Sequence, residues 1–300
     1  MIEISDAFAE HRRLLFSTAY RMLGSVADAE DVLQDAWIKW DGVDRAGVAN
    51  HRAYLVRTVT NLCLTRLTSA RAQRETYVGP WLPEPLLTDA GGEAGTEPVP
   101  DASEKVERAE SVSLAMLVVL ESLSPLERAV FVLREAFGYS YAEIAEATER
   151  GEAAVRQAGH RARGHVQARR PRYDTDDDAR REVTDKFLAA CSGGDLNAVM
   201  ELLAPDVTAW SDGGGKVTAA RRPLHGVDNV ARWLLGVLAK PGTRNVSFES
   251  VGINGQPGVL FTVDGHLIGA LVVDTVDGLI QELRFQVNPD KFAGLTRRPA

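Results

Sequence analysis

Cysteine and long apolar runs are scarce in this chain of 300 residues. Its two cysteines, Cys63 and Cys191, lie far apart inside helical patterns, so we expect core residues rather than a disulfide or metal pair. No apolar run approaches the roughly 20 residues of a membrane-spanning helix. The N-terminus, MIEISDAFAEHRRLLF, lacks the basic start, apolar stretch and cleavage site of a signal peptide. We therefore expect a cytoplasmic protein with no membrane contact, metal or cofactor.

Lysine and arginine are absent from residues 77–104, a stretch that contains six acids. Five prolines and four glycines between residues 76 and 106 break any helical or strand periodicity. This composition predicts an acidic, extended linker over residues 76–106. On composition alone, a solvated tether is as good an interpretation as a functional segment.

Arginine, in contrast, is concentrated between residues 150 and 172, where seven Arg and two His face one acid, Glu152. The whole chain carries a formal net charge of -8, so the basic segment is a local feature. A polyanion is its expected partner, and DNA is the first candidate. The alternative is a solvated, arginine-rich helix in a helical bundle.

Two capping-box sequences precede the basic segment, SPLE from Ser124 and SYAE from Ser140. In each, serine and the glutamate three residues on satisfy N–H groups at a helix start. They predict helices from Pro125 and Tyr141 and a third from Glu152, the order of a helix-turn-helix. Small residues should pack the third helix inward, so that its outer side can enter a DNA groove. The inward set is Val155, Ala158, Ala162 and Val166, and the outward set is Arg156, Gln157, His160, Arg161 and Arg163.

The first 75 residues have an all-helical pattern. Residues 29–40 place apolar side chains on one helical stripe, and the opposite face is acidic. The stripe comprises Ala29, Val32, Leu33, Ala36, Trp37 and Trp40, and the acidic face comprises Asp28, Asp31 and Asp35. A further helix over residues 52–74 carries five Arg and no acid.

A third unit follows the charge reversal at residues 173–178. Asp-Gly pairs at residues 264–265 and 277–278 are turn signals between strands. Helices followed by antiparallel strands predict an α+β domain. The expected helices cover about 179–203 and 226–239, and the expected strands are Val246–Ile253, Gly258–Val263, His266–Thr275 and Leu279–Asn288.

The two helical blocks resemble the extracytoplasmic-function sigma factors, subunits that direct bacterial RNA polymerase to promoters. AYRMLGSVADAEDVLQDAWIKW and YLVRTVTNLCLTRLTSARAQRE resemble the second conserved region of that family. SPLERAVFVLREAFGYSYAEIAEA with AVRQAGHRAR resembles the fourth. The resemblance implies core RNA polymerase and promoter DNA as partners. It implies these domains: region 2 over 1–75, the linker over 76–106, region 4 over 107–172 and an extension over 178–295.

Single residues receive roles from this resemblance. Asn61 matches the position that captures a flipped base of the −10 element, with arginines nearby for phosphates. Those arginines are Arg57, Arg66, Arg71 and Arg74. The helix that docks on the polymerase clamp is matched by Asp28, Asp31, Gln34, Asp35 and Trp37. The outward set of the basic helix matches the reader of the −35 element, although the family often opens that helix with Ser or Thr where Gly151 stands here. Linkers of this family resemble nucleic acid in charge, which favours a functional role for residues 76–106.

The last third resembles the SnoaL-like cone fold, a curved sheet and helices around a pocket. A subgroup of the family with this extension carries three matching motifs. They are Trp81-Leu82-Pro83-Glu84-Pro85, Asp212-Gly213-Gly214-Gly215-Lys216 and Asn288-Pro289-Asp290-Lys291-Phe292. We expect the two C-terminal motifs to make regulatory contacts with the sigma domains and the linker, so that the extension controls the factor in cis.

An enzyme or a small-molecule sensor fused to a DNA-targeting module is the alternative function. Related cone folds use an Asp/His pair in the pocket, but the candidates here have no spacing that chemistry demands. They are Trp210, Asp212, His225, Asp264, His266 and Asp274. Phosphate binding at the glycine triplet is disfavoured because Val217-Thr218 is expected to continue as a strand. We expect no enzymatic activity.

Overall fold

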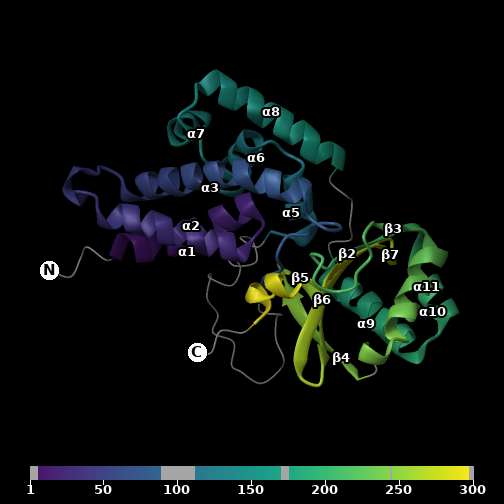
Figure 1. The fold of residues 1–300 in the computed structure, drawn as a ribbon. Coiled ribbons are helices and arrows are strands. Elements are labelled where there is room, and N and C mark those ends of the chain that lie inside the picture. The colour runs from purple at the N-terminus through teal and green to yellow at the C-terminus, as the bar shows by residue number, and fades with distance from the viewer. Residues whose placement is uncertain (1–5, 89–111, 170–175, 244, 297–300) are drawn as a thin grey trace. The chain divides into compact units, whose positions relative to one another are not determined.

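The computed structural model describes residues 6–88, 112–169, 176–243 and 245–296. They fall into two compact units (Figure 1). Residues 1–76 and 115–170 form the helical unit, and residues 77–114 and 171–300 form the C-terminal unit. The described first part of the predicted linker therefore groups with the C-terminal unit. Most of the linker's acids lie outside the described residues, namely Asp89, Glu93, Glu97, Asp101 and Glu104.

Three helices begin the helical unit: α1 (Asp6–Leu23), α2 (Val26–Asp41) and α3 (His51–Glu75). The start of α2 is the predicted one, because the Ser25 side chain accepts a hydrogen bond from the Asp28 N–H at 3.0 Å. All three helices pack against one another. Leu15, Met22, Leu33 and Leu55 are among their buried contacts.

The helix-turn-helix completes this unit. Its helices are α5 (Leu114–Glu121), α6 (Pro125–Phe131), α7 (Tyr141–Thr148) and α8 (Glu152–Arg169), with a π-helical turn (Val132–Ala136) after α6. Both capping boxes are formed, and the three predicted helix starts are confirmed. Helix α3 packs against α6 and α7, so the two predicted helical domains share one unit.

A buried arginine ties these helices together. The Arg128 side chain on α6 is 2% exposed. Its guanidinium donates to the Met22 carbonyl oxygen at the end of α1 (2.7 Å) and to the Glu121 carboxylate at the end of α5 (2.6 Å). Burial lowers the pKa of Arg128, while the adjacent carboxylate favours the charged form. This one side chain therefore satisfies acceptors on two other helices.

The C-terminal unit is an α+β domain, as predicted. Helices α9 (Asp177–Gly193), α10 (Leu196–Glu201) and α11 (Val227–Leu238) pack on a seven-stranded sheet of order β1-β4-β5-β6-β7-β2-β3. Neighbouring strands are antiparallel except β2 and β7, which are parallel. The strands are β1 (Leu87–Thr88), β2 (Leu203–Asp212), β3 (Leu224–His225), β4 (Val246–Ile253), β5 (Gln256–Val263), β6 (His266–Val276) and β7 (Leu279–Gln286).

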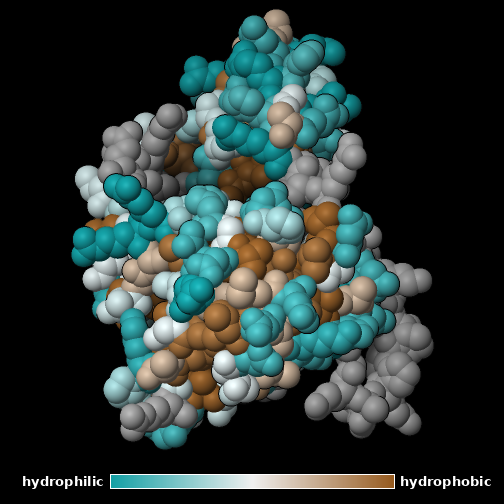
Figure 2. Space-filling view, turned by 90° about the vertical axis from the view of Figure 1, so that its right-hand side faces the viewer, coloured by the Kyte–Doolittle hydropathy of each residue, from teal (hydrophilic) through white to brown (hydrophobic). Residues whose placement is uncertain are grey.

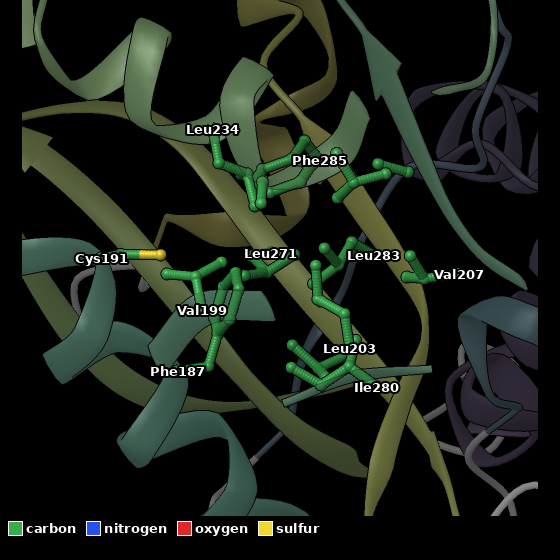
Figure 3. Packing of buried hydrophobic residues seen from close by; sticks show 14 of the residues in the cluster. Phe187, Cys191, Val199, Leu203, Val207, Leu234, Leu271, Ile280, Leu283 and Phe285 are labelled. Carbon is green, nitrogen blue, oxygen red and sulfur yellow. The ribbon is translucent and has the colours of Figure 1, made fainter. Parts of the chain in front are cut away.

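Apolar side chains fill the space between the sheet and these helices (Figure 3). Leu271, Leu283 and Phe285 reach from β6 and β7 toward the helices. They meet Phe187 of α9 and Leu234 of α11, and Trp233 packs edge-on against Phe285. The alternation of β-strand side chains places this set on one face and the polar residues of the same strands on the other.

Local predictions are wrong at three places. The helix expected over about 179–203 is instead two helices, α9 and α10, and Leu203 begins β2, a strand that was not predicted. Val217 and Thr218 do not continue as a strand, because the chain turns tightly through residues 214–216 and then stays irregular up to β3. Residues 87–88 of the linker form a strand, which pairs with β4. No helix in the described parts of the chain is both long and apolar enough to cross a membrane.

Candidate functional site

The face of α2 that was predicted to dock is exposed, acidic and partly apolar. Asp31, Gln34 and Asp35 are exposed, and Asp28 is partly exposed. Trp37, predicted to belong to the apolar stripe, is instead 50% exposed, and its neighbour Ile38 is 56% exposed. The other stripe residues are buried. Trp40 takes the buried position at this end of the helix, so the apolar periodicity wrongly assigns Trp37 to the core. The acidic face therefore also carries two large apolar side chains.

Arg66 on α3 links the two predicted surfaces of region 2. Its guanidinium contacts Asp28 at 3.0 Å and Asp31 at 2.6 Å. A residue assigned to DNA thus pairs with two residues assigned to the polymerase. Pairing between distant charges such as these cannot be read from sequence spacing.

Arg57 and Asn61 lie four residues apart on α3 and therefore share one face. Asn61 is partly exposed. Arg57 contacts Glu149, the left-handed residue that ends α7, at 2.7 Å, and this hydrogen bond raises the pKa of Arg57. Arg71 and Arg74 lie in the last turns of α3, where the side chains are outside the described part of the structure.

Helix α8 has the inward and outward faces that its sequence predicts. Val155, Ala158, Ala162 and Val166 are buried, and the five predicted readers are exposed. Helices α7 and α8 lie in the upper part of Figure 1, and the upper part of Figure 2 is largely hydrophilic. Three of the readers are paired: Arg156 with Glu152, Arg161 with Glu127 at 2.6 Å and Arg163 with Glu135 at 2.9 Å.

The partners of α8 orient its arginines. The Arg163 guanidinium donates to the Tyr141 hydroxyl at 2.6 Å, and the Arg156 guanidinium lies 5.2 Å from the centroid of the Tyr141 ring. Gly159 permits this packing, since a Cβ there would lie 3.0 Å from the Tyr141 ring. Burial raises the pKa of Glu127, but hydrogen bonds from Arg161 and Ser124 outweigh it and hold that pKa below its ordinary value.

In the C-terminal unit, the linker is bound by a cluster that we call the linker clasp: Tyr77, Leu82, Asp212, Asn288 and Lys291. Asp212 is fully buried and accepts from the Tyr77 hydroxyl (2.5 Å), the Leu82 N–H (2.8 Å) and the Lys291 ammonium (2.7 Å). Lys291 also donates to the Leu82 carbonyl oxygen (2.6 Å), and Asn288 donates to the Tyr77 hydroxyl (2.9 Å).

The two charged groups of the clasp, the Asp212 carboxylate and the Lys291 ammonium, pair with each other. The Lys291 ammonium lies 4.1 Å from the centroid of the Trp81 ring, so a buried cation has both a carboxylate and an aromatic face. Burial and the hydrogen bond to Asp212 raise the pKa of Tyr77. Tyr77 therefore stays a neutral donor to Asp212.

Parallel pairing of β2 and β7 brings the clasp residues together. Asp212 ends β2 opposite Gln286 of β7, and Asn288 and Lys291 follow two and five residues later. Asn288 caps the short helix Pro289–Lys291. Gly214 is required here, because its φ is +56° and a Cβ would lie 2.3 Å from the Asn288 amide nitrogen.

The remaining motif residues surround the clasp. Gly215 lies against Val78, and a Cβ on Gly213 would meet Ala219 at 2.7 Å. Lys216 and Asp290 form an exposed ion pair at 2.7 Å. Pro289 opens the short helix, and Phe292, partly buried, closes it.

Linker residues Leu82, Pro83, Glu84 and Pro85 are buried, which overturns the solvated-tether interpretation for this part of the linker. Gln286 donates to the Pro83 carbonyl oxygen at 3.4 Å. The linker is thus part of the C-terminal unit's packed structure up to Thr88.

The candidates for an Asp/His pair are dispersed. Asp212 belongs to the clasp, and Asp274 pairs with Arg284 on the sheet. His225 contacts Thr208 at 3.1 Å, Asp264 belongs to an exposed hairpin turn, and His266 follows that turn. Trp210 is partly buried on β2. The described residues also contain no group of three or more His, Cys, Asp or Glu that could hold a metal ion.

Known proteins match the chain along most of its length. Residues 7–73 match Sigma-70 region 2, residues 113–166 match Sigma-70, region 4, and residues 184–279 match the SnoaL-like domain. The ECF RNA polymerase sigma factor SigJ of Mycobacterium tuberculosis is 40% identical, over 98% of this chain and 94% of that protein. The probable ECF RNA polymerase sigma factor SigI of the same organism is 32% identical, over 95% and 93%. The crystal structure of SigJ matches with a TM-score of 0.74 at 36% identity, covering 97% of this chain and 99% of that one.

Proposed function

Since this chain belongs to the extracytoplasmic-function RNA polymerase sigma factors, we propose that it binds core RNA polymerase, reads a −10 and a −35 promoter element and is controlled in cis by its C-terminal domain. The observation that carries the control is the linker clasp, in which the C-terminal domain binds the chain immediately after α3. Helix α3 ends at Glu75 and the clasp begins at Tyr77. The domain therefore acts directly on the connection between regions 2 and 4.

Polymerase docking is assigned to the exposed face of α2. Asp31 and Asp35 provide negative charge for a basic partner, and Trp37 and Ile38 provide apolar area that would be buried on binding. The acids would then belong to the polar rim of the interface and the two apolar side chains to its core, the usual anatomy of a protein–protein interface.

The double substitution Asp31→Arg with Asp35→Arg should weaken core polymerase binding by on the order of tenfold or more, because like charges would then face each other across the interface. Affinity for core enzyme measures this. The matched control is Asp185→Arg with Asp206→Arg, which makes the same charge change at exposed acids of the C-terminal unit. Normal complex formation by the first variant would contradict the docking assignment.

Promoter reading is assigned to α3 and α8. On α3, Asn61 would bind the edge of an unstacked base and Arg57 a phosphate. On α8, Arg156 and Arg163 would enter the major groove, held in place by Tyr141. DNA binding would exchange the acid partners of these arginines for phosphates and base edges.

Arg156→Ala should weaken binding to the −35 element by about 1–3 kcal/mol if the side chain reaches a base edge, and should relax sequence preference there. Binding to promoters with altered −35 sequences tests it. Arg232→Ala is the matched control, since that arginine is also exposed and paired four residues along its own helix. Unchanged promoter preference in Arg156→Ala would remove this residue from the readers.

Control by the C-terminal domain is tested by truncation. One variant ends before Asp174 and lacks the whole domain, and another ends before Asn288 and lacks only the second half of the clasp. Both should change polymerase binding and promoter-directed transcription. If both truncated proteins behaved like the full chain, the regulatory proposal would be wrong.

A further inference from the structure

The sheet of the C-terminal unit contains three hairpin turns of the same kind, and one of them differs in its surroundings. Asn254-Gly255, Asp264-Gly265 and Asp277-Gly278 all place both turn residues at positive φ. The two Asp-Gly turns are exposed, as hairpin turns usually are. The Asn254 residue is only 3% exposed.

Asn254 is buried because it binds the connection between α3 and α5 at two places. Its backbone N–H donates to the Leu86 carbonyl oxygen (2.9 Å), and its side-chain Oδ1 accepts from the Leu86 N–H (3.0 Å). Its side-chain Nδ2 donates to the Val112 carbonyl oxygen at 3.1 Å. Thr88 adds a contact at the next residue, accepting from the Gly255 N–H at 3.0 Å.

The residue type fits this task. Asparagine tolerates the left-handed conformation and carries both a donor and an acceptor on one neutral side chain. Aspartate serves at the two exposed turns, but at position 254 it would bury a charge and offer no donor to Val112. One buried side chain thus joins Leu86, near the start of the linker, to Val112, two residues before α5.

The distance that the linker can span depends on this junction. Residues 76–113 connect α3 to α5, and a chain of that length reaches roughly 130 Å when extended. With Leu86 and Val112 held on one side chain, the reach is set by residues 76–85 and falls to about 35 Å. A promoter-reading residue can lie a full domain diameter from the linker, and the two diameters, roughly 50 Å together, give an upper limit of about 85 Å.

Promoter geometry uses all of this length. A −10 and a −35 element lie about 25 base pairs apart, or roughly 85 Å along a duplex at 3.4 Å per base pair. With the linker joined, regions 2 and 4 reach both elements only when every part is fully extended, whereas the released linker leaves slack of tens of ångströms.

We propose that Asn254 is a positioning residue that buckles the linker by holding Leu86 and Val112 together, and that the C-terminal domain thereby restrains promoter engagement until the buckle opens. This inference rests on the proposed control in cis and gives it a direction and a residue. The clasp binds Tyr77 and Leu82, which both lie toward the α3 end of the connection. Asn254 binds Leu86 toward that end and also Val112 at the α5 end.

Three variants of the full chain test the buckle. Asn254→Gly keeps the left-handed turn and removes the side chain, so the Leu86 amide should exchange its hydrogen at least tenfold faster, and the factor bound to core polymerase should associate with promoter DNA several-fold faster. Asn254→Asp keeps the acceptor for Leu86 but loses the donor to Val112, so the Leu86 amide should stay protected while association still becomes faster. Asp264→Gly makes the same change at an exposed turn and should alter neither.

Unchanged or slower association in both Asn254 variants would overturn the proposal. General damage to the sheet is recognised by hydrogen exchange at Val259 and Leu271, which are buried in its core and should stay protected. If clasp variants and truncations alter transcription while Asn254 variants do not, the buckle is wrong and control in cis remains. If none of them alters it, the proposed control itself fails.

Discussion

Asp212→Ala should lower the free energy of unfolding of the C-terminal unit by about 3–5 kcal/mol, the cost of removing one partner from a buried ion pair. The substitution leaves the Lys291 ammonium buried without its carboxylate and the Leu82 N–H without an acceptor. Urea unfolding followed by tryptophan fluorescence measures the loss, since Trp81 lies against Lys291. Residues 77–88 should also become sensitive to proteases in native buffer.

Asp290→Ala is the control for this variant. Asp290 belongs to the same pair of motifs and also bonds a lysine, Lys216, but both side chains are more than half exposed. Its loss should therefore cost less than about 1 kcal/mol. Equal stability losses in the two variants would contradict the assignment of Asp212 as the centre of the clasp.

Arg128→Ala should destabilise the helical unit by a similar amount, about 3–5 kcal/mol, because the Glu121 carboxylate and the Met22 carbonyl oxygen lose their shared buried donor. Thermal and urea unfolding of the full chain should show the loss in the helical transition. DNA and polymerase binding should fall together, since α6 supports the helix-turn-helix and also packs against α3.

Arg12→Ala provides the comparison in the same unit. Arg12 bonds Glu30 at 2.6 Å across α1 and α2, but both side chains are partly exposed, so the expected cost is below about 1 kcal/mol. A small loss in Arg128→Ala, equal to that in Arg12→Ala, would mean that the buried arginine is replaceable by water or by repacking.

Local signals in the sequence predict the elements well. The serines at 124 and 140 fix two helix starts because a capping box satisfies backbone N–H groups within four residues. The predicted strand Val246–Ile253 is confirmed, and the other three predicted strands are confirmed within two residues at each end. Those strands are bounded by turns, which require only neighbouring residues.

The sequence does not predict contacts between residues that lie far apart in the chain. Glu84 and its neighbours have the composition of a solvated linker, yet they are buried by a domain that begins about 90 residues later. The Asn254-Gly255 turn has the same local pattern as the exposed turns, so its role depends on linker atoms that no spacing rule connects to it. Trp37 was misassigned for a related reason: its helical position is apolar-periodic, but the described residues leave it 50% exposed. The regulatory and promoter-reading roles remain predictions.

The order in which the chain is synthesised determines when the clasp can form. Lys291 closes on Leu82 across a separation of 209 residues, and the sheet that presents it needs β7 before β2 can pair in parallel. A ribosome adding roughly 5–20 residues per second needs about 10–40 s to make that interval. Regions 2 and 4 are complete before Lys291 is synthesised, so we expect every newly made molecule to pass through a period without the clasp.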